Sequence, residues 1–236
     1  MSTRLAKGGR LLNKARALEF TFNGKRLRGF EGDTIASALL ANDQMLVGRS
    51  FKYHRPRGVV ASGAEEPNGL VHMGEGDQFE PNQRVTTTEL YDGLKASSQN
   101  HWPSLEFDVG VVNSKLSRFL PAGFYYKMFI HPRPFWKHVY EPIIRKSAGL
   151  GKAPESRDND SYEHFYAFTD VLVIGGGIAG LQAAKSAAQT GAKVLLLEQT
   201  AHLGGRTPVD GGEVGGQPAA AYIDALTAEL HAMENV

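Results

Sequence analysis

The sequence contains no cysteine among its 236 residues. This absence excludes disulfide bonds, thiolate nucleophiles and iron–sulfur clusters held by cysteine. The eight histidines follow no spacing typical of a zinc site, and no serine–histidine–acid order stands out. We therefore assign no metal site and no catalytic residue from the sequence, and any redox chemistry needs an organic cofactor.

Net charge and long apolar runs are also scarce. The formal net charge is +1, which gives no argument for a nucleic-acid partner. The most apolar stretch, residues 171–184, contains three consecutive glycines and is shorter than the roughly 20 residues that span a bilayer. The N-terminus lacks the apolar core of a secretory signal. These features predict a cytoplasmic protein with no membrane segment.

Two groups of charged residues need interpretation. The first 28 residues contain eight lysines and arginines but only one acidic residue, Glu19. This imbalance predicts a solvated, mobile N-terminal arm. Glu65 and Glu66 are adjacent, but neighbouring side chains diverge, so an exposed loop explains them better than a pair of catalytic carboxylates.

Residues 1–100 show the pattern of a β-grasp domain. Residues 18–30 alternate apolar and polar side chains around an Asn-Gly pair, which predicts a β-hairpin. The next segment has apolar residues at helical spacing, and Asp33 or Thr34 can cap that helix. A hairpin followed by a helix is the expected start of this α/β fold.

Residues 101–165 are rich in aromatic residues and are punctuated by proline. Aromatic side chains need a surface to bury against, so these residues are expected to form a connector packed on the domains. The most polar segment, residues 153–164, is the best position for a domain boundary.

Residues 166–236 contain the first part of a Rossmann-type dinucleotide-binding domain. An apolar strand leads into Gly175, Gly177 and Gly180, which form the pattern G-x-G-x-x-G ahead of a helix. The first glycine permits a tight turn, the second lets a pyrophosphate approach the backbone, and the third lets the helix pack on the strand. The helix start supplies unpaired N–H groups for the phosphates.

A second apolar strand ends at Glu198. Its carboxylate can accept a hydrogen bond from a ribose 2′-hydroxyl and would repel a 2′-phosphate, which favours NAD or FAD over NADP. Residues 203–206 (LGGR) resemble the second glycine pair of flavoprotein-type domains, and Arg206 either contacts a phosphate or lies in solvent. The candidate cofactor-binding residues are Gly175, Gly176, Gly177, Ile178, Ala179, Gly180, Glu198, Gln199, Gly205 and Arg206.

The chain resembles the α subunits of heterotetrameric sarcosine oxidases over essentially its whole length. The segments that carry the resemblance are GDTIASALLAND, GRSFKYHRPRGVVASGAEEPNGLV, PAGFYYKMF and DVLVIGGGIAGLQAA, in that order. The resemblance implies the N-terminal part of such a subunit, in which a ferredoxin-like β-grasp domain precedes a two-part dinucleotide-binding region and then a folate-binding domain. Two strands are too few for a buried parallel sheet, so residues 166–236 are expected to need cover from a partner or from a missing C-terminal part.

The resemblance also bears on the loop that contains Glu66. Related β-grasp domains hold a [2Fe-2S] cluster with four cysteines, and these positions correspond here to Ala61, Glu66, Gly69 and Thr86. Because none of the four can act as a thiolate, the domain is expected to be cluster-free and structural.

The function that the resemblance implies is that of an assembly with β, γ and δ subunits. It oxidises sarcosine to glycine, passes the one-carbon unit to tetrahydrofolate and produces hydrogen peroxide. The α subunit holds a noncovalent NAD, FAD and FMN are expected at the β subunit and its contact with α, and sarcosine and tetrahydrofolate bind elsewhere in the assembly. This chain alone is expected to be inactive.

Two alternatives stay open. The first alternative to a sarcosine oxidase subunit is an FAD-binding subunit of a related secondary-amine or amino-acid dehydrogenase. The second is a non-catalytic scaffold chain whose nucleotide fingerprint is vestigial.

Overall fold

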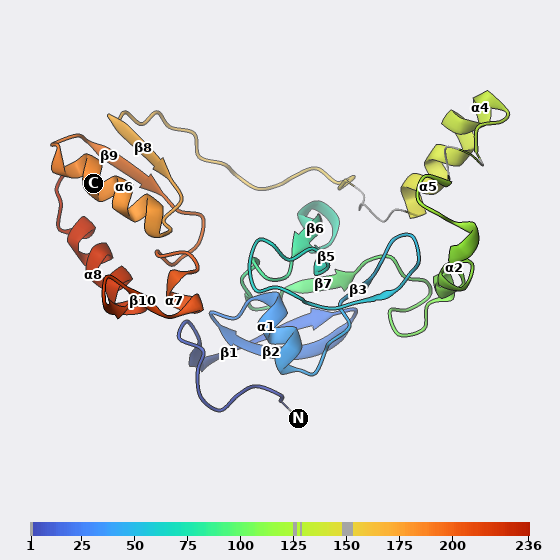
Figure 1. The fold of residues 1–236 in the computed structure, drawn as a ribbon, viewed down its shortest axis with the longest axis horizontal. Coiled ribbons are helices and arrows are strands. Elements are labelled where there is room, and N and C mark those ends of the chain that lie inside the picture. Colours follow the sequence, from blue (N-terminus) through green and yellow to red (C-terminus); the bar gives the residue numbers. More distant parts are fainter. Residues whose placement is uncertain (1, 125–126, 128, 148–152) are drawn as a thin grey trace. The chain divides into compact units, whose positions relative to one another are not determined.

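The computed structural model describes residues 2–124, 127, 129–147 and 153–236 (Figure 1). The chain divides into two compact units, residues 1–160 and residues 161–236. The division falls inside the polar segment 153–164. Each unit has its own hydrophobic core and is described by itself.

Unit 1 is built on a five-stranded mixed sheet with the strand order β2-β1-β7-β5-β6. Strands β1 and β7 pair in parallel, and the other neighbours pair antiparallel. The predicted hairpin is confirmed, with Asn23 and Gly24 in its turn at φ angles of 50° and 78°. The strands are β1 (Asn13–Phe22), β2 (Lys25–Glu31), β5 (Leu70–Met73), β6 (Glu80–Arg84) and β7 (Lys95–Ser98).

Helix α1 (Ile35–Ala41) packs on this sheet and confirms the predicted helix. The Thr34 side chain accepts from the N–H of Ser37, and the Ser37 side chain accepts from the N–H of Thr34, so the two residues form a capping box. Ile35 and Leu39 are fully buried against the sheet. Local capping and the apolar spacing therefore agree on where the helix begins and which face it buries.

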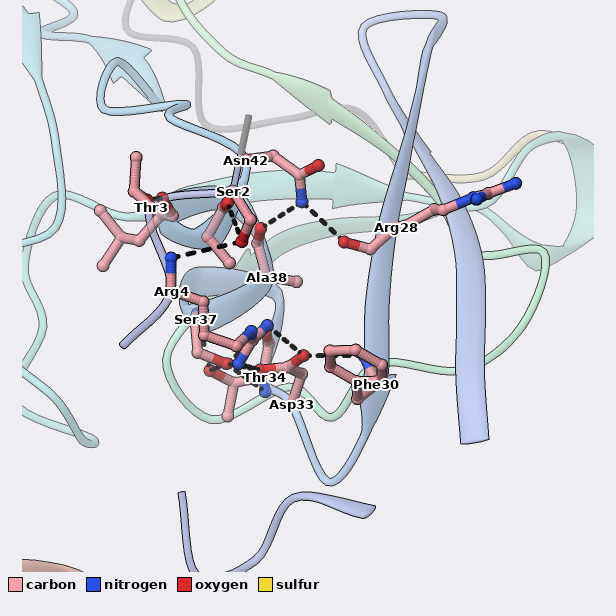
Figure 2. Close-up of polar contacts among 12 residues, drawn as sticks. Ser2, Thr3, Arg4, Arg28, Phe30, Asp33, Thr34, Ser37, Ala38 and Asn42 are labelled. Atoms are coloured by element: carbon pink, nitrogen blue, oxygen red, sulfur yellow. Dashed lines mark hydrogen bonds and ion pairs between the residues drawn. The ribbon is translucent and has the colours of Figure 1, made fainter. Parts of the chain in front are cut away.

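The N-terminal residues are attached to unit 1 and do not form the predicted mobile arm (Figure 2). The Thr3 N–H donates to the carbonyl of Ala41 at 3.0 Å. The Arg4 guanidinium donates to both carboxylate oxygens of Asp33, at 3.0 and 2.6 Å, and Asp33 is fully buried. The other seven basic residues are exposed as predicted, but the prediction was wrong for the first residues, because Arg4 meets a buried carboxylate.

The other elements of unit 1 are short. Residues near the start of the connector belong to the core region, since Leu105 is buried and the buried Asp108 pairs with His54 at 2.7 Å. The elements are β3 (Gly48–Arg49), β4 (Pro56–Arg57), η1 (Gly76–Gln78), η2 (Val109–Val111), α2 (Val112–Lys115), η3 (Ser117–Phe119), α4 (Arg133–Phe135), η4 (Trp136–Tyr140) and α5 (Glu141–Ser147).

The later connector does not show the expected packing. No described residue from 129 to 146 or from 153 to 168 is buried. Phe165 and Tyr166 are 81% and 95% exposed. Aromatic content alone therefore did not reveal that these side chains lie at the surface of this chain.

Unit 2 contains a parallel pair of strands, β8 (Val171–Ile174) and β9 (Val194–Leu197), which confirms both predicted strands. Helices α6 (Ile178–Gln189) and α8 (Ala219–His231) cover one face of the pair, where Leu181, Leu226 and other apolar residues form the core. The shorter elements are α7 (Thr207–Asp210), β10 (Glu213–Val214) and β11 (Gln217–Pro218). Within the described residues, no helix is both long enough and apolar enough to cross a bilayer.

The other face of β8 and β9 is open. Leu172, Ile174 and Leu197 point away from the helices and are 50%, 80% and 47% exposed. Side chains alternate between the two faces of a strand, so the apolar character of both faces marks a sheet built to be covered on both sides.

Candidate dinucleotide-binding site

The turn between β8 and α6 contains the predicted glycine pattern. Gly175 has a φ of 101°, which is in the left-handed region where glycine is preferred. A Cβ atom at Gly180 would lie 1.9 Å from the carbonyl oxygen of Gly175, so a side chain there would push the helix off the strand end. The first and third glycines are therefore required by the fold itself.

The second glycine of the pattern borders open space. Gly177 has a φ of −69°, which any residue can adopt, and a Cβ atom added there would meet nothing within 4 Å. Because neither strain nor crowding requires glycine here, the absence of a side chain keeps the backbone accessible. This is the geometry that a pyrophosphate needs to approach the loop.

Helix α6 begins directly after Gly177, and no side chain caps it. The N–H groups of Ile178, Ala179 and Gly180 lie in its first turn, where an α-helix has no internal acceptors for them. The helix dipole adds partial positive charge at the same end. This end of α6 therefore suits an anion beside the open Gly177.

The second glycine pair lies against the first. The Gly204 N–H donates to the carbonyl of Gly176 at 2.7 Å, and Gly177 and Gly204 form a parallel bridge. A Cβ atom at Gly205 would lie 3.3 Å from the Cα atom of Gly177. Two glycine-rich segments, distant in sequence, thus form one side-chain-free surface.

Glu198 lies at the end of β9, and its carboxylate points to the glycine turn. One oxygen accepts from the Gly176 N–H at 2.7 Å and the other from the Thr200 N–H at 2.8 Å. The Thr200 N–H is the largest cause that holds the pKa of Glu198 below its usual value, and it outweighs partial burial, which raises the pKa. Glu198 is therefore an ionised acceptor at neutral pH.

The remaining predicted residues lie at the edge of this surface. Gln199 is exposed next to Glu198. Arg206, for which the sequence allows either a phosphate contact or solvent, forms an ion pair with Asp210 at 2.7 Å. The structure thus brings the ten predicted positions to one end of β8 and β9, with the Arg206 side chain already engaged by a carboxylate.

Glu66 is a polar site that sequence reasoning missed. The sequence predicts an exposed loop at this position, but Glu66 is 1% exposed. One carboxylate oxygen accepts from the N–H groups of Val60 and Ala61, both at 2.7 Å, and the other from those of Asn68 and Gly69, at 2.7 and 3.0 Å. No periodic pattern in the sequence signals such a carboxylate, because the acceptor and its donors lie within one irregular loop.

Among the described residues, no group of three or more histidine, aspartate or glutamate side chains is arranged to hold a metal ion. The strongest chemical feature of the described chain is therefore the glycine surface beside Glu198, which is suited to a phosphate-containing ligand.

Comparison with known families agrees with this division of the chain. Residues 15–101 match the family described as 2Fe-2S iron-sulfur cluster binding domain. Residues 170–224 match the family described as FAD dependent oxidoreductase, and this segment includes every predicted cofactor-binding residue. The segment that matches the iron–sulfur family has no cysteine to ligate such a cluster.

The relatives that are similar over nearly the entire chain include two α subunits. The sarcosine oxidase subunit alpha of Rhizobium meliloti is 53% identical over 235 residues, which is 100% of this chain and 24% of the relative. Over its whole length, this chain is similar to the N-terminal part of a sarcosine oxidase α subunit. The α subunit of Corynebacterium sp. (strain U-96) is 34% identical over 96% of this chain and 19% of its own length. The chain thus spans a quarter or less of these α subunits.

A solved structure supports the same fold. The crystal structure of L-proline dehydrogenase from P. horikoshii matches with a TM-score of 0.50 and 20% identity, over 93% of this chain and 33% of that chain. At this identity the likeness concerns the fold alone.

Proposed function

We propose that residues 175–206 bind the ADP moiety of a dinucleotide within an oxidoreductase subunit. The observation that carries the proposal is the open space at Gly177, in a turn whose other glycines are fixed by the fold. The pyrophosphate would lie there, at the N–H groups that open α6. The ribose hydroxyls would donate to Glu198, which already faces the turn.

Two dinucleotides share this chemistry. FAD is supported by the family matched over residues 170–224. NAD is the ligand that the resemblance to sarcosine oxidase α subunits implies. An ionised Glu198 disfavours a 2′-phosphate, so NADP is the weakest candidate. The bound group would supply hydride or electron transfer, while the residues of this chain bind and orient its ADP part.

For the larger assembly, we propose sarcosine as the substrate and other sarcosine oxidase subunits as partners. The support is the similarity to α subunits of that oxidase. Transfer of the one-carbon unit to tetrahydrofolate and production of hydrogen peroxide are part of the same proposal and rest on the resemblance. In this proposal, the part of this chain is to hold the ADP moiety of a cofactor.

The proposal is tested by measuring nucleotide binding to the purified chain. Titration calorimetry with ADP, NAD, FAD and NADP, together with mass analysis of any nucleotide released on denaturation, separates the candidates. FAD also gives a visible absorption band that NAD lacks. We expect ADP and one of the two dinucleotides to bind, and NADP to bind least. A chain that circular dichroism shows to be folded, yet that binds none of them, contradicts the proposal.

A variant pair makes the test specific to the site. Gly177→Ala should fold normally, because a Cβ atom there has room, yet lower dinucleotide affinity by about tenfold or more, because the methyl group enters the space of the pyrophosphate. Gly48→Ala is the matched control in unit 1, where the nearest atom is 3.8 Å away. Equal affinity of both variants would count against the assignment of Gly177.

A further inference from the structure

The loop of residues 60–69 folds around the Glu66 carboxylate. Its two oxygens accept from four backbone N–H groups of the loop at 2.7 to 3.0 Å. The backbone carbonyl of Glu66 accepts from the Arg84 guanidinium at 3.0 Å, which ties the loop to β6. One side chain therefore satisfies four donors of the loop that contains it.

This loop is the place where the matched family and the sequence disagree. The family binds a [2Fe-2S] cluster, and the four cysteine positions implied by the resemblance are Ala61, Glu66, Gly69 and Thr86. Each takes part in the same local network. The N–H groups of Ala61 and Gly69 donate to Glu66, and the buried Thr86 hydroxyl donates to the carbonyl of Gly63 at 2.7 Å.

The packing leaves no room for a side chain at Gly69, one of these four positions. A Cβ atom at Gly69 would lie 2.5 Å from Cγ2 of Val85 and 3.3 Å from Cγ of Glu66. The residues present therefore supply no thiolate, and Gly69 has no space for a cysteine side chain. They do fit a single anionic group held by inward-facing N–H donors.

We propose that the Glu66 carboxylate is a built-in anion that takes the place of the iron–sulfur cluster and holds the loop of residues 60–69 closed. A cluster with thiolate ligands is an anion that organises the loop around it, and here a side chain of the loop supplies the negative charge. The domain thereby keeps the family's loop without its prosthetic group.

The electrostatic surroundings agree with an ionised Glu66. Burial raises the pKa of this carboxyl, but the N–H donors of Ala61, Asn68, Val60 and Gly69 together hold it below its usual value of 4.5. The charged neighbours are Arg84, which binds the Glu66 carbonyl, and Glu65, which is exposed on the same loop. The stabilisation is therefore complete above that usual value and is lost as the pH falls through the lower folded-state pKa.

The test compares Glu66→Gln with Glu65→Gln in the full chain. Both remove one negative charge from the same loop, but only Glu66→Gln would aim an NH₂ donor at two backbone N–H groups. We expect amide exchange in residues 60–69 to become at least about tenfold faster in Glu66→Gln and to stay unchanged in Glu65→Gln. The stability difference between wild type and Glu66→Gln should be largest near neutral pH and should shrink in acid.

Chemical rescue separates an anion from mere packing. Glu66→Ala leaves the four N–H donors around a space that formate can enter. Formate should raise the melting temperature of Glu66→Ala and restore slow exchange in the loop, and should leave wild type and Glu65→Gln unchanged. Equal exchange in Glu66→Gln and Glu65→Gln, a stability difference independent of pH, or absence of rescue by formate would each overturn the proposal.

Discussion

The bond between Arg4 and Asp33 offers the clearest stability prediction. Asp33 has no exposed surface, and the Arg4 side chain is 16% exposed. Removing one partner of a buried ion pair costs about 3–5 kcal/mol, because the other charge stays buried without its partner. Asp33 would keep two further donors, the Phe30 N–H at 2.8 Å and the Ser37 hydroxyl at 2.6 Å.

We therefore expect a smaller loss, about 2 kcal/mol, for Arg4→Met. Methionine retains most of the aliphatic stem but loses both bonds to Asp33 and the stacking of the guanidinium over Phe30 at 5.3 Å. For a unit of this size the loss corresponds to roughly 4–8 °C in melting temperature. Urea denaturation followed by circular dichroism measures it, and deuterium uptake locates it at α1.

Arg16→Met is the matched control. Arg16 pairs with Glu31 at 2.6 Å, but these side chains are 66% and 43% exposed. Water screens such a pair, so this change should cost at most about 0.5 kcal/mol. If Arg4→Met and Arg16→Met lower the free energy of unfolding equally, the N-terminal segment is not held by a buried pair and the reasoning is refuted.

Two further changes test one local contact in each unit, at Gly180 in unit 2 and at Asp108 in unit 1. Gly180→Ala places a methyl group 1.9 Å from the Gly175 carbonyl oxygen, so it should destabilise unit 2 by about 1–3 kcal/mol and abolish ADP binding, and an unchanged melting curve would contradict this. Burial raises the pKa of Asp108, but bonds from the Trp102 N–H and from His54 hold it below its usual 3.8, so Asp108→Asn should lower stability more at about pH 7 than at about pH 3. Urea titrations at the two pH values measure the difference, and an equal loss at both would argue against an ionised Asp108.

Local rules predicted the parts of the fold that depend on local chemistry. Asn23 and Gly24 specify a hairpin because both tolerate positive φ, and Thr34 specifies a helix start because its hydroxyl can accept a free N–H. The spacing of Gly175, Gly177 and Gly180 likewise locates the nucleotide turn. In each case the residues that carry the signal are also the residues that form the structure.

The features that the sequence did not predict depend on contacts set by the path of the backbone, several of them between segments that are distant in the sequence. Gly204 meets Gly176 only because the segment after β9 folds back over the turn, and no spacing rule gives that contact. Glu66 looked like half of an exposed acidic pair, since its burial follows from the path of the surrounding backbone. Arg4 lay in a basic run and gave no sign of its partner, which is 29 residues further along the chain.

The closed loop at Glu66 has a consequence for how this protein is made. A domain that must receive iron and sulfide depends on metal supply, on assembly factors and on protection from oxygen while it matures. A carboxylate is translated with the chain, is present from the moment of synthesis and is inert to oxygen and to cellular reductants. Yield and melting temperature should therefore be the same for protein produced in iron-depleted, iron-rich, aerobic or anaerobic cultures.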